Sequence, residues 1–128
     1  MNKDYDEWNK MKKIVNKNRT RKLYHKRDIW WCNLGLNVGY EQDGTGKDYD
    51  RPALILKDFN QYVCLVIPLT SSSKISKYYI DIGCIGGKKS KAIISQIKLI
   101  DTKRLINKVE MLDKEVFNKI RKAVRNLI

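Results

Sequence analysis

The chain has little of the chemistry on which most hydrolases and metalloenzymes depend. It contains one histidine, His25, so a Ser–His–Asp triad or a Cys–His pair has a single weak candidate base. Its three cysteines, Cys32, Cys64 and Cys84, lie far apart, and no C-x-x-C motif or cluster of histidines and carboxylates has the spacing of a zinc or other transition-metal site. We therefore expect no metal and no cofactor, and we expect the cysteines to be buried, reduced thiols.

Long hydrophobic runs and an apolar signal sequence are also missing. The longest apolar stretches, such as residues 63–67, are too short to cross a bilayer. The first residues, Met1-Asn2-Lys3-Asp4-Tyr5-Asp6, have no apolar core of the kind that directs export. These absences predict a cytoplasmic protein without membrane segments.

Acidic residues are scarce relative to basic ones. The chain has 27 Lys and Arg against 14 Asp and Glu, a net charge of +13. Such a charge attracts polyanions but leaves open whether the partner is DNA, RNA, an acidic protein or an anionic membrane. The length of 128 residues suits one domain, and an apolar content of 42% suffices for a core.

The basic charge is concentrated at the N-terminus. The first 27 residues hold ten Lys and Arg against three Asp and Glu. Trp8, Met11 and Val15 recur at helical spacing, which predicts a short amphipathic helix near residues 4–16. The basic run at 17–22 is either a solvated tail or an arm that follows nucleic-acid phosphates. We divide the chain into a basic extension, 1–26, and a domain, 27–128.

The rest of the chain is predicted to be β-rich with a closing helix. Five segments rich in strand-forming residues are separated by turns: 28–34, 52–56, 62–69, 77–82 and 92–100. Asp113 is a good helix N-cap, and the apolar residues after it share one face: Val116, Phe117, Ile120, Val124 and Leu127. Short strands without helices between them favour a closed or half-closed antiparallel barrel.

Two features of the β-rich part invite a functional reading. Trp30 and Trp31 are adjacent on one strand, so one should face the core and the other the opposite side; core or dimer packing is the more common use, and base stacking the alternative. The segment 35–50 is a long loop with several glycines and carboxylates, and loops of this length are often functional. Its Gly44-Thr45-Gly46-Lys47 sequence is not a P-loop, because the first glycine and the Ser or Thr after the lysine are missing.

RNA cleavage fits the chemistry that remains. The substrate supplies its own nucleophile, the 2′-hydroxyl, so an enzyme needs to align it, neutralise the phosphate and move two protons. Arg51 could bind the phosphate, Thr70 could donate to a phosphoryl oxygen, and Glu41 could accept the 2′-hydroxyl proton. The alternatives are a surface ion pair of Arg51 with Asp48 or Asp50 and a turn-capping role for Thr70, and spacing alone does not show that these residues meet.

Several segments in order resemble the motifs of the MazF/PemK toxins. The segments are Arg27-Asp28-Ile29-Trp30-Trp31, Gly39-Tyr40-Glu41-Gln42, Arg51-Pro52-Ala53-Leu54-Ile55, Ile67-Pro68-Leu69-Thr70-Ser71-Ser72, the stretch 95–105, and Asp113-Lys114-Glu115-Val116. The resemblance covers the chain from about Arg27 to its end.

The resemblance implies a fold, an activity and partners. The fold is an SH3-like antiparallel barrel with a C-terminal helix, usually a homodimer. The activity is that of a type II toxin, restrained by a cognate antitoxin, which cuts single-stranded RNA at short sequences and leaves a 2′,3′-cyclic phosphate and a 5′-hydroxyl. Arg51 and Thr70 match the catalytic residues of the family, with Glu41 at the border of the site. The residues that we expect to bind RNA are Gln42, Lys47, Ser71, Ser72 and Lys74.

The chain departs from the family in three places. Arg27 stands where the family usually has glycine, residues 43–50 lengthen the loop before Arg51, and typical members have no counterpart of the basic extension. The longer loop puts the cleavage sequence in question. Two other functions stay open: a gyrase inhibitor resembling the CcdB toxins, which share the barrel, and a nucleic-acid-binding module without activity.

Overall fold

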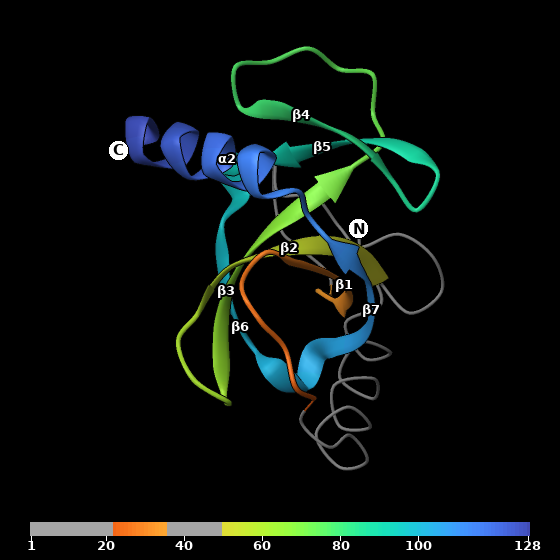
Figure 1. The fold of residues 1–128 in the computed structure, drawn as a ribbon, viewed down its shortest axis with the longest axis vertical. Coiled ribbons are helices and arrows are strands. Elements are labelled where there is room, and N and C mark those ends of the chain that lie inside the picture. Colours follow the sequence, from red (N-terminus) through yellow and green to blue (C-terminus); the bar gives the residue numbers. More distant parts are fainter. Residues whose placement is uncertain (1–21, 36–49) are drawn as a thin grey trace, which may run out of the picture.

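The computed structural model describes residues 22–35 and 50–128, which form β-strands and one α-helix (Figure 1). The strands are β1 (Asp28–Asn33), β2 (Asp50–Asp58), β3 (Val63–Thr70), β4 (Tyr79–Ile85), β5 (Lys88–Ile93), β6 (Lys98–Asp101) and β7 (Leu105–Met111). Short 3-10 turns, Ile94–Gln96 and Thr102–Arg104, flank β6, and the helix is α2 (Lys114–Leu127). The helix predicted near residues 4–16 and the loop 36–49 lie outside the described residues.

The strands form one antiparallel sheet that curls into a half-barrel. Their order is β4-β5-β3-β2-β1-β7, and β6 pairs with β3 off this path. The first half of β3 pairs with β6, whereas its last two residues, Leu69 and Thr70, pair with β5. Because β3 changes partner along its length, the sheet bends around it. The expected antiparallel barrel with a C-terminal helix is confirmed.

Alternating side chains fill two cores, one on each side of the central strands. Ile29, Leu54 and Ile67 belong to the core that α2 covers, together with Phe117 and Ile120. The barrel interior forms the second core, which contains Tyr24, Trp30, Cys32, Ile55, Cys64, Val66 and Leu105. Successive residues of β1 therefore face opposite sides. As predicted, Trp30 is buried at 5% exposure, and Trp31 points away from the barrel interior and is 39% exposed.

The helix begins where the sequence predicts. The Asp113 carboxylate accepts hydrogen bonds from the N–H groups of Glu115 and Val116 at 3.1 and 3.2 Å, which satisfies two of the free donors of the first turn. Phe117 and Ile120 are buried, and Figure 1 shows the helix lying beside β4 and β5. The apolar stripe ends early, because Leu127 is exposed.

Two strand predictions and one cysteine prediction were wrong, and one strand was missed. The strand expected at 92–100 is interrupted, because β5 ends at Ile93 and a 3-10 turn separates it from β6. The strand expected at 77–82 instead runs from Tyr79 through Gly83 to Ile85, and β7 was not predicted at all. Cys84 is exposed on β4, whereas the other two cysteines are buried, and all three are free thiols.

The entry into β1 is tied to the rest of the fold by backbone contacts. Arg27 has a φ of +80°, in the left-handed region. Its N–H donates to the Ile55 carbonyl at 2.9 Å, and its carbonyl accepts from the Leu112 N–H at 2.8 Å. The next residue, Asp28, is buried and forms an ion pair with Lys108 of β7 at 3.2 Å. These contacts fix β1 between β2 and β7.

Candidate active site

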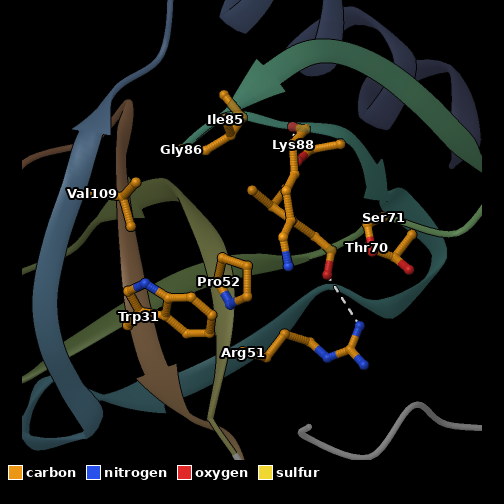
Figure 2. Close-up of a pocket in the computed structure, with 11 residues that line it drawn as sticks. Trp31, Arg51, Pro52, Thr70, Ser71, Ile85, Gly86, Lys88 and Val109 are labelled. Atoms are coloured by element: carbon orange, nitrogen blue, oxygen red, sulfur yellow. Dashed lines mark hydrogen bonds between the residues drawn. The ribbon is translucent and has the colours of Figure 1, made fainter.

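A pocket of about 260 Å³ opens where the central strands meet the β4–β5 hairpin (Figure 2). Its walls come from β1, β2, β3, β4, β5 and β7. The lining residues are Trp31, Arg51, Pro52, Leu69, Thr70, Ser71, Ile85, Gly86, Lys88, Ser90 and Val109. Arg51, Thr70 and Ser71, which the sequence singles out, therefore share one pocket.

The pairing of β2 with β3 explains why Arg51 and Thr70 meet. The register joins Ala53 to Pro68, and its extension by two residues brings Arg51 alongside Thr70. The Arg51 side chain is 6% exposed, and its Nη1 donates to the Leu69 carbonyl at 3.0 Å (Figure 2). This hydrogen bond fixes the guanidinium at the end of β3.

Thr70 is the last residue of β3 and begins a loop rich in serine. Its Oγ1 accepts the N–H of Ser72 at 3.2 Å, and the Ser72 hydroxyl in turn accepts the N–H of Lys74 at 3.1 Å. These are the short side-chain-to-backbone turns that Ser and Thr favour. Because Oγ1 uses a lone pair for Ser72, its hydroxyl proton stays available to donate to a ligand.

The other residues predicted to bind RNA are distributed differently. Ser71 lines the pocket, whereas Ser72 and Lys74 lie further along the loop and are not among the lining residues. The Lys74 ammonium stands 5.4 Å from the centre of the Tyr79 ring. Glu41, Gln42 and Lys47 lie outside the described residues, so their relation to the pocket stays a prediction.

Sequence reasoning missed Lys88 as a pocket residue and favoured packing for Trp31. Lys88 begins β5, in a segment that reads as a turn because it follows two glycines and precedes another lysine. The sequence did contain a signal for Trp31, because the alternation of side chains along β1 places one of the two tryptophans on the side away from the barrel interior. Figure 2 shows Lys88 extending into the pocket toward Arg51 and Pro52.

The pocket is electrostatically suited to an anion. Two cationic side chains, Arg51 and Lys88, line it, and none of the described lining residues is acidic. With the hydroxyls of Thr70 and Ser71, these groups can give charge-assisted and neutral hydrogen bonds to a phosphate. In the described ranges, no group of three His, Cys, Asp or Glu residues is placed to hold a metal ion, and no helix is long and apolar enough to cross a membrane.

Comparison with known proteins gives a family match and a shared fold. A family model described as "PemK-like, MazF-like toxin of type II toxin-antitoxin system" matches residues 25–128. MazF from Deinococcus radiodurans (Form-I) is 17% identical, with a TM-score of 0.67 over 83% of this chain and 96% of that chain. The MazE–MazF complex (Form-II) from the same organism is 15% identical, with a TM-score of 0.64 over 83% of this chain and 95% of that chain.

A third similar structure is an endoribonuclease in complex with its cognate antitoxin from a mycobacterial species. It is 15% identical, with a TM-score of 0.62 over 81% of this chain and 93% of that chain. At these identities the likeness to solved structures shows the fold alone. The search of curated protein sequences found no match.

Proposed function

Since the chain belongs to the PemK-like, MazF-like toxins of type II toxin–antitoxin systems, we propose that it is a sequence-selective, metal-independent endoribonuclease that cleaves single-stranded RNA. The observation that carries this proposal is that Arg51 and Thr70 line one pocket, next to a second cation, Lys88. A scissile phosphate bound there would meet the Arg51 guanidinium and the Thr70 hydroxyl, with a second positive charge nearby.

The proposed reaction uses the nucleophile of the substrate. The 2′-hydroxyl oxygen attacks the adjacent phosphorus, the bond from phosphorus to the 5′-oxygen breaks, and the products are a 2′,3′-cyclic phosphate and a 5′-hydroxyl. One proton leaves the 2′-oxygen, and one is delivered to the 5′-oxygen. In-line attack places extra negative charge on the phosphoryl oxygens, which is where donors lower the barrier.

We assign the roles by what each side chain can do. Arg51 stays protonated at any working pH, so it binds the phosphate and stabilises the transition state instead of accepting a proton. Thr70 donates its hydroxyl to a phosphoryl oxygen. Glu41 is the candidate acceptor of the 2′-hydroxyl proton. Gln42, Lys47, Ser71, Ser72 and Lys74 are proposed to hold the flanking RNA.

The proposal includes two protein partners. We propose a cognate antitoxin, in keeping with the relatives whose structures are described as complexes with MazE or with a cognate antitoxin. We also propose a homodimer. A gene for a small acidic protein directly upstream would support the antitoxin, and light scattering of the purified protein would test the dimer.

The direct test is cleavage of a long single-stranded RNA in EDTA, followed by mapping of the ends. We expect cuts at a short sequence with 2′,3′-cyclic phosphate and 5′-hydroxyl ends. Arg51→Ala should slow cleavage by about 10²–10³-fold, as loss of a transition-state donor does elsewhere. Arg125→Ala, which removes an exposed arginine on α2, is the matched control and should cleave at the normal rate.

Two outcomes would contradict the proposal. RNA that stays intact at high enzyme concentration would favour the gyrase inhibitor or the inactive binding module. Equal rates for Arg51→Ala and Arg125→Ala would show that cleavage does not use this pocket. The assignment of Glu41 has its own test, because Glu41→Gln should abolish most of the activity, and a variant with full activity would exclude it as the base.

A further inference from the structure

The pocket has an apolar side that phosphate binding does not explain. Trp31, Pro52, Ile85 and Val109 contribute this side, and the hydroxyls of Thr70 and Ser71 lie across from it (Figure 2). Trp31 and Pro52 are direct partners in the pairing of β1 with β2, so the indole and the proline ring lie next to each other. A flat, partly apolar group could rest against this surface.

Trp31 is exposed although its strand is otherwise buried. The other five residues of β1 are at most 5% exposed, whereas Trp31 is 39% exposed and belongs to neither core. Leaving a large aromatic ring in water forgoes the stabilisation that its burial would give. The indole is therefore available to a ligand that enters the pocket.

Lys88 is held at the pocket by a fixed hairpin. Gly86 and Gly87 form a two-residue turn between β4 and β5, with φ values of +58° and +85° and with Ile85 paired to Lys88. The Gly86 N–H donates to the Glu110 carboxylate of β7 at 3.1 Å, which ties the tip of the hairpin to the far wall. Among the described residues, none forms an ion pair with Lys88.

We propose that this half of the pocket is a nucleotide subsite, in which Trp31 stacks on a base of the RNA and Lys88 binds the phosphate next to the scissile one. The inference rests on the proposed function and adds two residues that select and hold the substrate. An aromatic face with a nearby cation is the usual recognition pattern for single-stranded nucleic acid.

The test compares four variants on a short RNA that carries one mapped cleavage site. Trp31→Ala removes the ring and Trp31→Phe keeps an aromatic face, while Lys88→Ala removes the cation. Lys89→Ala is the matched control, because Lys89 is exposed on the same strand and does not line the pocket. Each variant is measured for kcat, for KM and for the Kd of the same oligonucleotide with a single deoxynucleotide at the cleavage site, which blocks 2′-hydroxyl attack.

We expect the effects to appear in binding. Trp31→Ala should raise KM and Kd by about 5- to 150-fold, the range for loss of one base–aromatic stack, and Trp31→Phe should stay within about 3-fold of the natural protein. Lys88→Ala should weaken binding and lower the slope of log K against log salt by about 0.7, as for one phosphate contact to a single strand. Lys89→Ala should change the Kd and the salt slope much less than Lys88→Ala does.

The outcomes separate this inference from the proposed function. If the natural protein cleaves RNA but Trp31→Ala and Lys88→Ala bind and cleave as it does, the subsite is wrong and the function stands. If the natural protein does not cleave, the proposed function fails, and the Kd values of the four variants for a single-stranded RNA without a mapped site still decide whether the subsite binds nucleotides. Variants that bind RNA normally but lose inhibition by the antitoxin would overturn the subsite in favour of a protein-binding pocket. Thermal unfolding of each variant checks that it is folded.

Discussion

At the scale of single residues, substitutions of Thr70 test the role of one chemical group, the side-chain hydroxyl. Thr70→Val keeps the shape and removes the hydroxyl, so we expect the single-turnover cleavage rate to fall by about 10²–10³-fold, because a transition-state donor is lost. Thr70→Ser keeps the hydroxyl and should retain most of the rate. A Thr70→Val protein that cleaves as fast as Thr70→Ser would exclude the donor role.

Substitutions of Arg27 test whether the backbone at this position is strained. Its φ of +80° costs an L-residue about 1–2 kcal/mol, and glycine avoids this strain but loses about 0.5–1 kcal/mol through its freedom in the unfolded chain. Both Arg27→Gly and Arg27→Ala lose the hydrogen bond from Nε to the Leu112 carbonyl at 2.9 Å. We therefore expect Arg27→Gly to be more stable than Arg27→Ala by about 0.5–1 kcal/mol in urea unfolding. The reverse order would contradict a strained Arg27.

The candidate site could be predicted only in part from the sequence. Arg51 and Thr70 were found by the order of motifs, and their meeting depends on the register of β2 and β3, which spacing along the chain does not specify. Lys88 was missed because its place depends on how the β4–β5 hairpin docks on β7, a contact between segments far apart in the sequence. Such contacts leave no local pattern of residue types.

At the scale of elements, the β4–β5 hairpin depends on its glycine turn. Gly87 has a φ of +85°, and a Cβ added there would meet no atom within 4 Å, so a substitution changes backbone strain without a steric clash. Gly87→Ala should lower the free energy of unfolding by about 1–2 kcal/mol, and Gly87→Asn should cost less because asparagine tolerates this conformation. Gly87→Ala should also raise the KM for RNA, because the turn positions the Lys88 side chain at the pocket. Equal stability of the two variants would contradict a left-handed turn.

The elements that were predicted well are those with strong local signals. β1 and β3 are rich in β-branched or aromatic residues, β2 has the aliphatic run Ala53-Leu54-Ile55-Leu56, and α2 has its Asp113 cap and a regular apolar stripe. β7 was missed because its sequence, LINKVEM, lacks a regular alternation: Leu105 and Ile106 are adjacent apolar residues, and the polar Asn107 and Lys108 follow them. The end of β5 could not be placed, since residues 92–100 are mainly apolar, and the polar Ser95 and Gln96 in the 3-10 turn are too few to mark a break in the strand.

At the scale of the whole molecule, a buried thiol in the barrel core makes the free energy of unfolding depend on pH in the alkaline range. Burial, with smaller contributions from Asp101 and Asp58, raises the pKa of the Cys64 thiol from 9.0 to about 12. The folded state therefore keeps the thiol protonated while the unfolded chain loses the proton. The stability from this group is complete below pH 9 and is lost progressively as the pH rises toward 12.

Cys64→Val should weaken this dependence. Between pH 9 and 12 the natural protein should lose stability more steeply than the variant, by up to about 1.4 kcal/mol per pH unit. Urea unfolding at a series of pH values measures both slopes. Cys84→Val, at an exposed position, is the control and should leave the slope unchanged. Identical slopes for Cys64→Val and the natural protein would show that the Cys64 thiol does not titrate in this way.

The net charge of +13 and the cationic pocket together suit a protein that attracts a polyanion and binds it at one place. The central claim is that the pocket cleaves RNA through the 2′-hydroxyl of the substrate. The most direct measurement compares two oligonucleotides that carry the same mapped site and differ only in the 2′-oxygen before the scissile phosphate. The claim predicts that the deoxy form binds with similar affinity and is not cut at that bond. Cleavage of the deoxy form at the same bond would contradict it.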